Sequence, residues 1–307
     1  MQFFLILFPI FCIFIVGFIS QKLLHFDIAN LSKMSLYVLS PFLAFKTFYT
    51  HTLTIDYIFY SIYLFSLCFI IIGIVYFCSF FMKWNTQENC AMILSSCFMN
   101  NGNYGTPVIL VFFGEMGFDL AVIIMVLQQF VMSTVGIYYA AKGSSGKDIV
   151  SQKAVLKKVI KMPIAYGALL GILFQLFHVP LTSSILNSIG MIGDASIVII
   201  MIILGMQLSM LTIKHIDYSK ITIALTLRMI ISPLIATVLV YFLPIETTYK
   251  QILIILAAMP SAANTTLLSV QFNTKPELVS SSTFISTLIS LITLPIVLWL
   301  VGTPIPN

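Results

Sequence analysis

The sequence predicts an all-α integral membrane protein of ten transmembrane helices, and three observations support this fold class. The chain of 307 residues is 60% hydrophobic and 8% charged, whereas soluble domains carry about 25% charged residues. A chain so poor in charge cannot cover a surface that faces water, so its solvent is lipid. Ten apolar stretches approach the length that crosses a bilayer, and two of them are interrupted at matching places in the two halves of the chain.

The ten spans are predicted from runs of roughly 20 apolar residues, the length that a helix needs to cross the hydrocarbon core. They cover residues 3–20, 31–50, 57–82, 89–113, 118–142, 162–178, 183–209, 220–243, 248–272 and 277–301. The first has no basic residue before it and no small-residue cleavage site after it, so we expect a span and not a signal peptide. The sixth is the shortest, and the fourth and ninth contain the interruptions.

Residues 143–161 form the one long connection, and they divide a single transmembrane domain (1–307) into two halves. The segment 143–148 is Gly-Ser-Ser-Gly-Lys-Asp, which is typical of a linker. Residues 151–161 fit either a helix lying on the membrane surface or a solvated extension of span six. Because each half (1–142 and 162–307) has five spans, an odd number, we expect inverted repeats related by an axis in the membrane plane.

The distribution of basic residues predicts which ends of the spans face the cytoplasm. With the N-terminus outside, two lysines fall on the outer side and Arg228 falls inside a span. The inner side then holds twelve lysines: Lys22, Lys33, Lys83, Lys142, Lys147, Lys153, Lys157, Lys158, Lys161, Lys214, Lys220 and Lys275. This asymmetry predicts a multi-pass protein of the cell membrane with both termini extracellular.

The two interruptions are the strongest functional signal in the sequence. Span four contains Met-Asn-Asn-Gly-Asn-Tyr-Gly-Thr-Pro at 99–107, and span nine contains Met-Pro-Ser-Ala-Ala-Asn-Thr-Thr at 259–266. Backbone can leave its helix at membrane depth only where it is buried in protein or lines a watery cavity. A matched pair of broken spans is the usual sequence sign of a carrier's binding site.

A helix broken at the bilayer midplane has free amides at one end and free carbonyls at the other. The amide end attracts anions, and the carbonyl end suits cations. We therefore expect helices four and nine to cross and to bind substrate through Asn100, Asn101, Gly102, Asn103, Gly105, Pro107, Pro260, Ser261, Asn264 and Thr265. The alternative is that these polar residues only hold neighbouring helices together.

Two charged residues fall inside predicted spans and are candidates for ion coupling or charge pairing. Asp194 is about 12 residues into span seven, roughly 18 Å deep at 1.5 Å per residue, unless that span begins later. Arg228 could attract the anion, pair with Asp194, or extend to the cytoplasmic headgroups. Glu115 and Asp119 are expected in a solvated outer loop, and the four histidines fall at span ends.

Other functions find little support in the sequence. The five cysteines lie in or beside apolar runs without metal-ligand spacing, so we expect packing roles, no metal and no cofactor beyond a coupling ion, H⁺ or Na⁺. An intramembrane aspartyl protease needs two buried aspartates, and only one is predicted, so the protein is not expected to be an enzyme. No basic patch with aromatic residues points to nucleic acid. A channel or a sensor that binds without transporting remains open, as does a homodimer.

The motifs resemble those of the auxin efflux carrier family. Asn100 to Pro107 is similar to its span-four signature, 259–264 to its second crossover, 39–45 to its span-two motif and 204–208 to its span-seven ending. The resemblance implies two inverted five-helix repeats with crossed helices four and nine, as in bile-acid symporter-like and sodium/proton antiporter-like folds. It also implies transport of an organic anion, malate or malonate in the bacterial branch, which the short central linker favours. Met99 and Val198 depart from the Arg and Pro that many relatives have.

Overall fold

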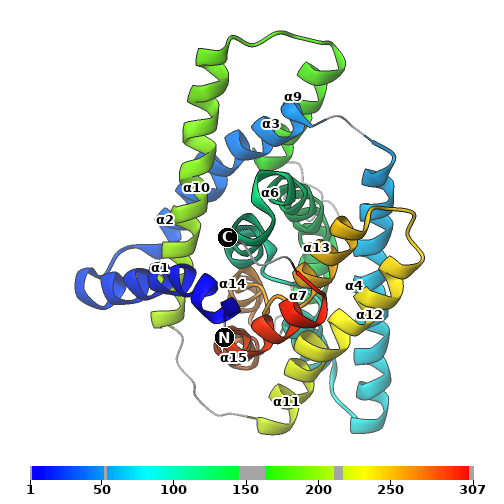
Figure 1. Cartoon of the computed structure of the whole chain (residues 1–307). Helices are drawn as coiled ribbons and strands as arrows, with labels where there is room; N and C mark the ends of the chain where they lie inside the picture. The colour runs from blue at the N-terminus through cyan, green and yellow to red at the C-terminus, as the bar shows by residue number, and fades with distance from the viewer. Residues whose placement is uncertain (1, 52–53, 145–162, 211–216, 304–307) are drawn as a thin grey trace.

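The computed structural model describes residues 2–51, 54–144, 163–210 and 217–303, and every regular element in these ranges is a helix (Figure 1). Within them, seven helical segments are long and apolar enough to cross a membrane. One of the seven, Asn101–Lys142, is 42 residues long and turns at Gly114, where φ is 63°, so it covers parts of two predicted spans. The all-helical membrane prediction is confirmed, and one shorter apolar helix, Pro163–Leu176, coincides with predicted span six.

The first half of the chain contains continuous helices and one that is interrupted. Its elements, where η marks a π-helical turn, are α1 (Gln2–Leu24), α2 (Ile28–Met34), η1 (Ser35–Leu39), α3 (Ser40–Thr50), α4 (Asp56–Met82), α5 (Thr86–Ser96), η2 (Asn101–Gly105), α6 (Thr106–Val131), η3 (Met132–Gly136) and α7 (Ile137–Lys142). Helix α5 has only 11 residues, and it ends before the predicted interruption.

The second half follows a similar order. Its described elements are α9 (Pro163–Leu176), α10 (Ser183–Met210), α11 (Tyr218–Thr226), η4 (Leu227–Ile231), α12 (Ser232–Tyr241), α13 (Thr247–Ala257), α14 (Ala263–Phe272) and α15 (Pro276–Leu300). Helix α13 also has 11 residues and ends at the second interruption. The predicted linker falls almost wholly on residues 145–162, so both alternatives for 151–161 lie outside the described residues.

Four of the predicted spans pack closely on one another, and we call this group the panel: α1, α2–η1–α3, α9 and α10. Helix α1 packs against α10, α9 packs against α3, and α10 crosses α3 (Figure 1). Glycines allow these approaches, since a Cβ at Gly17 would overlap the carbonyl oxygen of Ile202 and one at Gly205 that of Phe14. Gly167 and Gly171 fit in the same way against Pro41 and Phe45 of α3. Small residues are what let membrane helices pack backbone to backbone.

The remaining helices form what we call the core: α4, α5 to α7 and α11 to α15. Every residue of α5 from Asn89 to Ser96 is buried, as are five of the last six residues of α13, so both short helices run into the middle of the protein. The panel touches the core chiefly through α3 on α6, α10 on η2 and α1 on α15. The free cysteines lie among the packed side chains, with Cys68, Cys90 and Cys97 buried.

An ionic cluster ties the ends of core helices together on the face predicted to be cytoplasmic. The Glu88 carboxylate accepts hydrogen bonds from Lys220 at 2.9 Å and Lys275 at 3.1 Å, which links α5 to α11 and to the start of α15. Lys220 also donates to Asp217 at 2.6 Å, and this hydrogen bond holds the pKa of Asp217 below its ordinary value.

The panel packing predicts a difference between two glycines in long apolar helices. Gly205→Ala on α10 would overlap the backbone of α1, and overpacking of this kind costs about 1–3 kcal/mol. Gly73→Ala on α4 has no atom within 4 Å of the added Cβ, so it is the matched control. We expect a lower thermal unfolding midpoint in detergent for the first variant only, and equal midpoints would contradict the packing.

Candidate functional site

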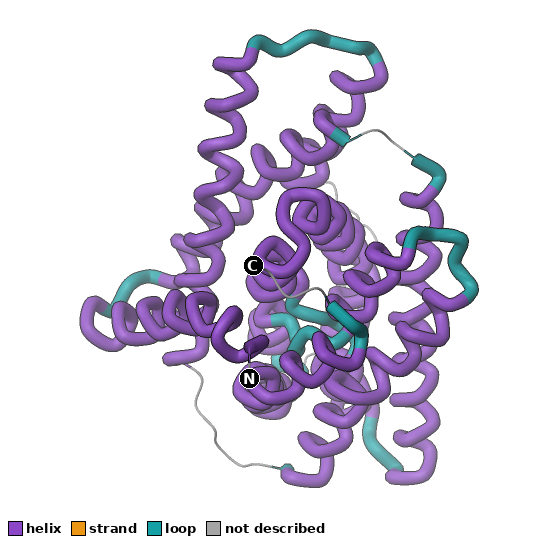
Figure 2. Tube along the Cα trace, in the orientation of Figure 1, coloured by secondary structure: helices purple, strands orange, loops and turns teal. Residues whose placement is uncertain are grey.

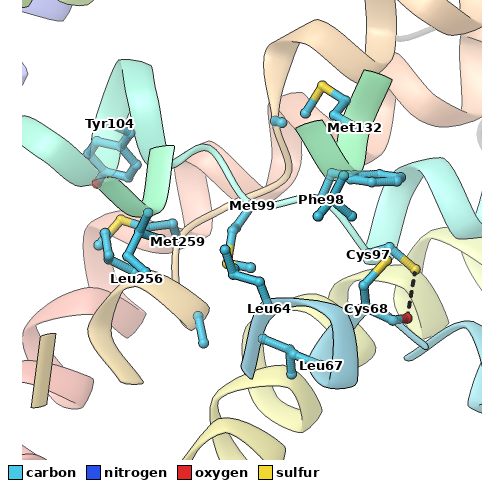
Figure 3. Close-up of a cluster of buried hydrophobic side chains, with 14 of the residues drawn as sticks. Leu64, Leu67, Cys68, Cys97, Phe98, Met99, Tyr104, Met132, Leu256 and Met259 are labelled. Atoms are coloured by element: carbon cyan, nitrogen blue, oxygen red, sulfur yellow. Dashed lines mark hydrogen bonds between the residues drawn. The ribbon is translucent and has the colours of Figure 1, made fainter. Parts of the chain in front are cut away.

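The two interruptions meet in the centre of the core. Met99 and Ser261 form an antiparallel backbone bridge. The N–H of Asn100 donates to the carbonyl of Pro260 at 2.8 Å, and the N–H of Ala262 donates to the carbonyl of Phe98 at 2.9 Å. Figure 2 shows short loop segments inside the helical bundle, and Figure 3 shows Met99 between Met259 on one side and Phe98 on the other. We call this meeting of residues 97–100 and 258–262 the crossover.

Two helices end at the crossover and two begin there. Helices α5 and α13 bring their carbonyl ends, and η2 with α6 and α14 leave with their amide ends. The carbonyl of Asn100 accepts from the N–H groups of Tyr104 and Gly105. The N–H groups of Asn101 to Asn103, like those of Ala263 and Asn264 in α14, precede any carbonyl of their own helix that could accept from them. Both amide ends therefore carry partial positive charge.

Arg228 occupies the opposite, carbonyl side of the crossover. Its guanidinium donates to the carbonyls of Ser96 and Cys97 at 3.2 Å each, at the end of α5. It also donates to the carbonyl of Ala257 at the end of α13 and to the Ser232 hydroxyl. The side chain is completely buried. One fixed positive charge thus faces the negative ends of both short helices, an arrangement that the helix dipole makes favourable.

This placement settles two of the alternatives predicted for Arg228. It does not extend to the headgroups, because it is fully buried, and it does not pair with Asp194, because its partners are carbonyls and Ser232. Asp194 lies on α10 in the panel, where both carboxylate oxygens accept from Lys46 at 3.1 Å. Its side chain is 50% exposed, so it is not a deeply buried acid. Of the three alternatives for Arg228, attraction of the anion is the one that remains open.

Most of the buried residues predicted to bind substrate are engaged in holding the crossover together. Asn101 donates to Gln128 of α6, and Gln128 donates to the carbonyl of Met99. The Ser261 hydroxyl donates to the carbonyl of Ser95 at 2.5 Å, and the Ser261 N–H donates to the Ser286 hydroxyl at 3.1 Å.

Four further buried candidates make structural contacts, whereas the side-chain amide nitrogen of Asn100 has no partner in the described structure. The Thr265 hydroxyl caps its own helix at the carbonyl of Ala262, at 2.7 Å. Pro107 is buried in the first turn of α6, and Pro260 contributes its carbonyl to the crossover. Gly105 packs where a Cβ would meet Leu256 at 2.8 Å.

Gln128 was missed by the sequence analysis. Gln128 and Gln129 stand together in an otherwise apolar part of predicted span five, and that adjacency was the available signal. Asp119 was also misplaced: it lies on α6 with a side chain only 16% exposed, not in a solvated loop, while Glu115 is exposed as expected.

Asn103 and Asn264 differ from the other candidates, because both are partly exposed. Among the residues that the structure describes, neither side-chain amide makes a hydrogen bond. They stand at the amide ends of η2 and α14, one from each half of the chain. Gly102 is partly exposed beside Asn103. Two buried polar atoms nearby, Asn100 Nδ2 and Asn101 Oδ1, also have no partner in the described structure. Polar groups thus remain available for a ligand on the amide side.

The Arg228 contacts predict that this charge is needed for a stable crossover. Arg228→Met would leave the buried carbonyls of Ser96 and Cys97 without a donor and the carbonyl of Ala257 with only the Ser232 hydroxyl. Hydrogen bonds to charged groups contribute about 1.5–3 kcal/mol each. We expect a strongly lowered unfolding midpoint in detergent, partly restored in Arg228→Lys. Lys33→Met, at an exposed lysine of α2, is the control and should unfold like wild type. An unchanged midpoint for Arg228→Met would show that the carbonyl ends do not depend on it.

Comparisons with known proteins agree with this architecture. A family model described as membrane transport protein matches residues 3–298. The chain is similar to an uncharacterized transporter of Methanocaldococcus jannaschii, 32% identical over 240 residues that cover 76% of this chain and 75% of the relative. It is also similar to an uncharacterized transporter of Methanothermobacter thermautotrophicus, 28% identical over 213 residues, 69% of this chain and 68% of the relative. The protein is therefore a multi-pass membrane transporter and not an enzyme, and it belongs to the membrane transport protein family, that of the auxin efflux carriers.

Proposed function

We propose that the protein is a secondary carrier that moves a small organic anion across the cell membrane by alternating access. The single observation that supports this most is the pairing of the two interrupted segments, from which two helix amide ends start. Each amide end carries an uncommitted and partly exposed asparagine, Asn103 or Asn264. Amide ends of helices bind carboxylates without a full positive charge in contact with them.

The electrostatics around the crossover favour an anion over a cation. In the described ranges, no carboxylate makes a hydrogen bond or ion pair with a crossover residue, whereas Arg228 adds one positive charge behind it. Arg228 also takes up the carbonyls that would otherwise suit a cation. The departure at Met99, where many relatives have Arg, therefore does not leave the site without a positive charge.

We further propose that the ten predicted spans form two inverted repeats. The elements α5, break, η2–α6 in the first half correspond to α13, break, α14 in the second. The panel contacts also fit two inverted repeats. Span one of the first half packs on span seven, the second span of the other half, and span six packs on span two in the same way. Relative movement of panel and core would expose the crossover to each side in turn, with both chain termini outside.

A small dicarboxylate such as malate or malonate is the substrate class that we propose. A compact dianion can place one carboxylate at each amide end, near Asn103 and near Asn264. Purified protein in proteoliposomes loaded with one dicarboxylate is expected to exchange it saturably for labelled malate or malonate. A channel would show flux that does not saturate, a sensor would bind without exchange, and either result would contradict the carrier.

The two uncommitted asparagines are predicted to contribute to binding and not to folding. Asn103→Ala and Asn264→Ala should each reduce exchange at low substrate concentration at least tenfold, which corresponds to about 1.4 kcal/mol or more. Their unfolding midpoints should stay close to wild type, because neither amide bonds to the described protein.

Asn187→Ala is the matched control, because this asparagine lies exposed on α10 in the panel. It should exchange substrate like wild type. Normal exchange in both Asn103→Ala and Asn264→Ala would remove the amide ends from the site.

A further inference from the structure

A second polar cluster lies away from the crossover, where the panel meets the core. The Asp119 carboxylate, on α6 of the core, is 3.2 Å from His51 Nε2 and accepts from the Thr47 hydroxyl at 3.3 Å. Both partners come from the end of α3 in the panel. Asp119 is 16% exposed and His51 is 40% exposed, so water reaches the imidazole more easily than the carboxylate.

The surroundings leave His51 as the only basic side chain that contacts Asp119 among the described residues. Leu43, Phe118 and Val122 pack between α3 and α6 as a small apolar cluster of their own. Lys46 is within electrostatic reach, but its ammonium is bonded to both oxygens of Asp194.

The other titratable groups that face the pair are Glu115 on α6 and the Tyr57 phenol on α4. A histidine–aspartate contact therefore joins the two bodies whose relative movement the carrier needs.

Of the two ion pairs described outside the Glu88 cluster, the Asp119–His51 pair is the one suited to exchange a proton. Imidazole is the side chain whose charge ordinarily changes between pH 5 and 8. The Lys46–Asp194 pair lies within the panel, so it does not join the panel to the core. The carbonyl ends of α5 and α13, where a sodium ion would find ligands, are occupied by the Arg228 guanidinium.

We propose that Asp119 and His51 form the coupling-proton site of this carrier, an inference that rests on the proposed function. A proton added to His51 gives an imidazolium that attracts the Asp119 carboxylate, which strengthens the contact of α3 with α6. Loss of the proton weakens that contact. A proton that moves with the anion also offsets its charge against the membrane potential.

The test separates exchange from accumulation in the same proteoliposomes, with labelled L-malate as the probe. Exchange at equal pH on both sides requires no net proton movement, whereas uphill accumulation driven by an imposed pH gradient does. Asp119→Asn and His51→Gln are expected to lower gradient-driven accumulation at least tenfold and to keep exchange within threefold of wild type.

Glu115→Gln is the matched control, since it removes an exposed carboxylate one helical turn before Asp119 on the same helix. It should accumulate malate like wild type, and so should Asp194→Asn. The inference is overturned if Asp119→Asn accumulates malate normally, if it loses exchange and accumulation equally, or if a sodium gradient alone drives accumulation in wild type. Wild-type protein that exchanges no dicarboxylate refutes the carrier proposal itself, which is a separate outcome.

Discussion

The need to satisfy broken backbone in the centre of an apolar protein governs this structure. Two helices end and two begin at one place. In a lipid-embedded chain, no bulk water is present there to hydrogen-bond the free N–H and C=O groups of these helix ends. The chain meets this requirement in two ways. The two segments form backbone hydrogen bonds with each other, from Asn100 to Pro260 and from Ala262 to Phe98. Arg228 donates hydrogen bonds to the carbonyl ends of both α5 and α13. The consequence is an asymmetry: the carbonyl side is closed by a fixed cation, while the amide side keeps unused donors.

That asymmetry connects the fold to transport. Gln128, Ser261 and Thr265 stabilise the crossover, so the side chains that remain free, Asn103 and Asn264, are those that can recognise a substrate. Within the panel, the helices pack closely at glycines. The panel touches the core through fewer contacts. The proposed alternating-access mechanism requires two bodies that move relative to each other, and we assign these to the panel and to the core that carries the crossover. The Asp119–His51 contact lies on the boundary between them.

Much of the architecture could be predicted from the sequence, because lipid imposes simple rules. Low charge and the length of apolar runs indicate a membrane protein, and the Asn-Gly-Asn-Tyr-Gly-Thr-Pro segment correctly predicts a first break nearby. The break itself lies at residues 97–100, and residues 101–107 already form η2 and the first turn of α6. Which polar residues of the breaks bind other parts of the protein, and which stay free, could not be predicted in the same way. Whether an asparagine binds substrate or protein depends on what lies across from it, and Gln128, distant in sequence, decides this for Asn101.

Charged residues were the least predictable part for the same reason. A lone arginine in an apolar run suggests an acidic partner. Arg228 instead donates to backbone carbonyls at Ser96 and Ala257, each more than 25 residues away in the sequence. Asp194 was expected to be deep, but Lys46 from another span accompanies it at a half-exposed position. Asp119 follows the turn at Gly114 and was expected in solvent, but helix α3 covers it.

The most direct test of this account is a structure determined with malate or malonate bound. We expect a carboxylate of the substrate at hydrogen-bond distance, about 3 Å, from the first-turn N–H groups of η2 or α14 and from the amide of Asn103 or Asn264. Arg228 should remain on the carbonyls of Ser96, Cys97 and Ala257. Substrate bound elsewhere, with the amide ends unoccupied, would contradict the claim that the broken helices form the transport site.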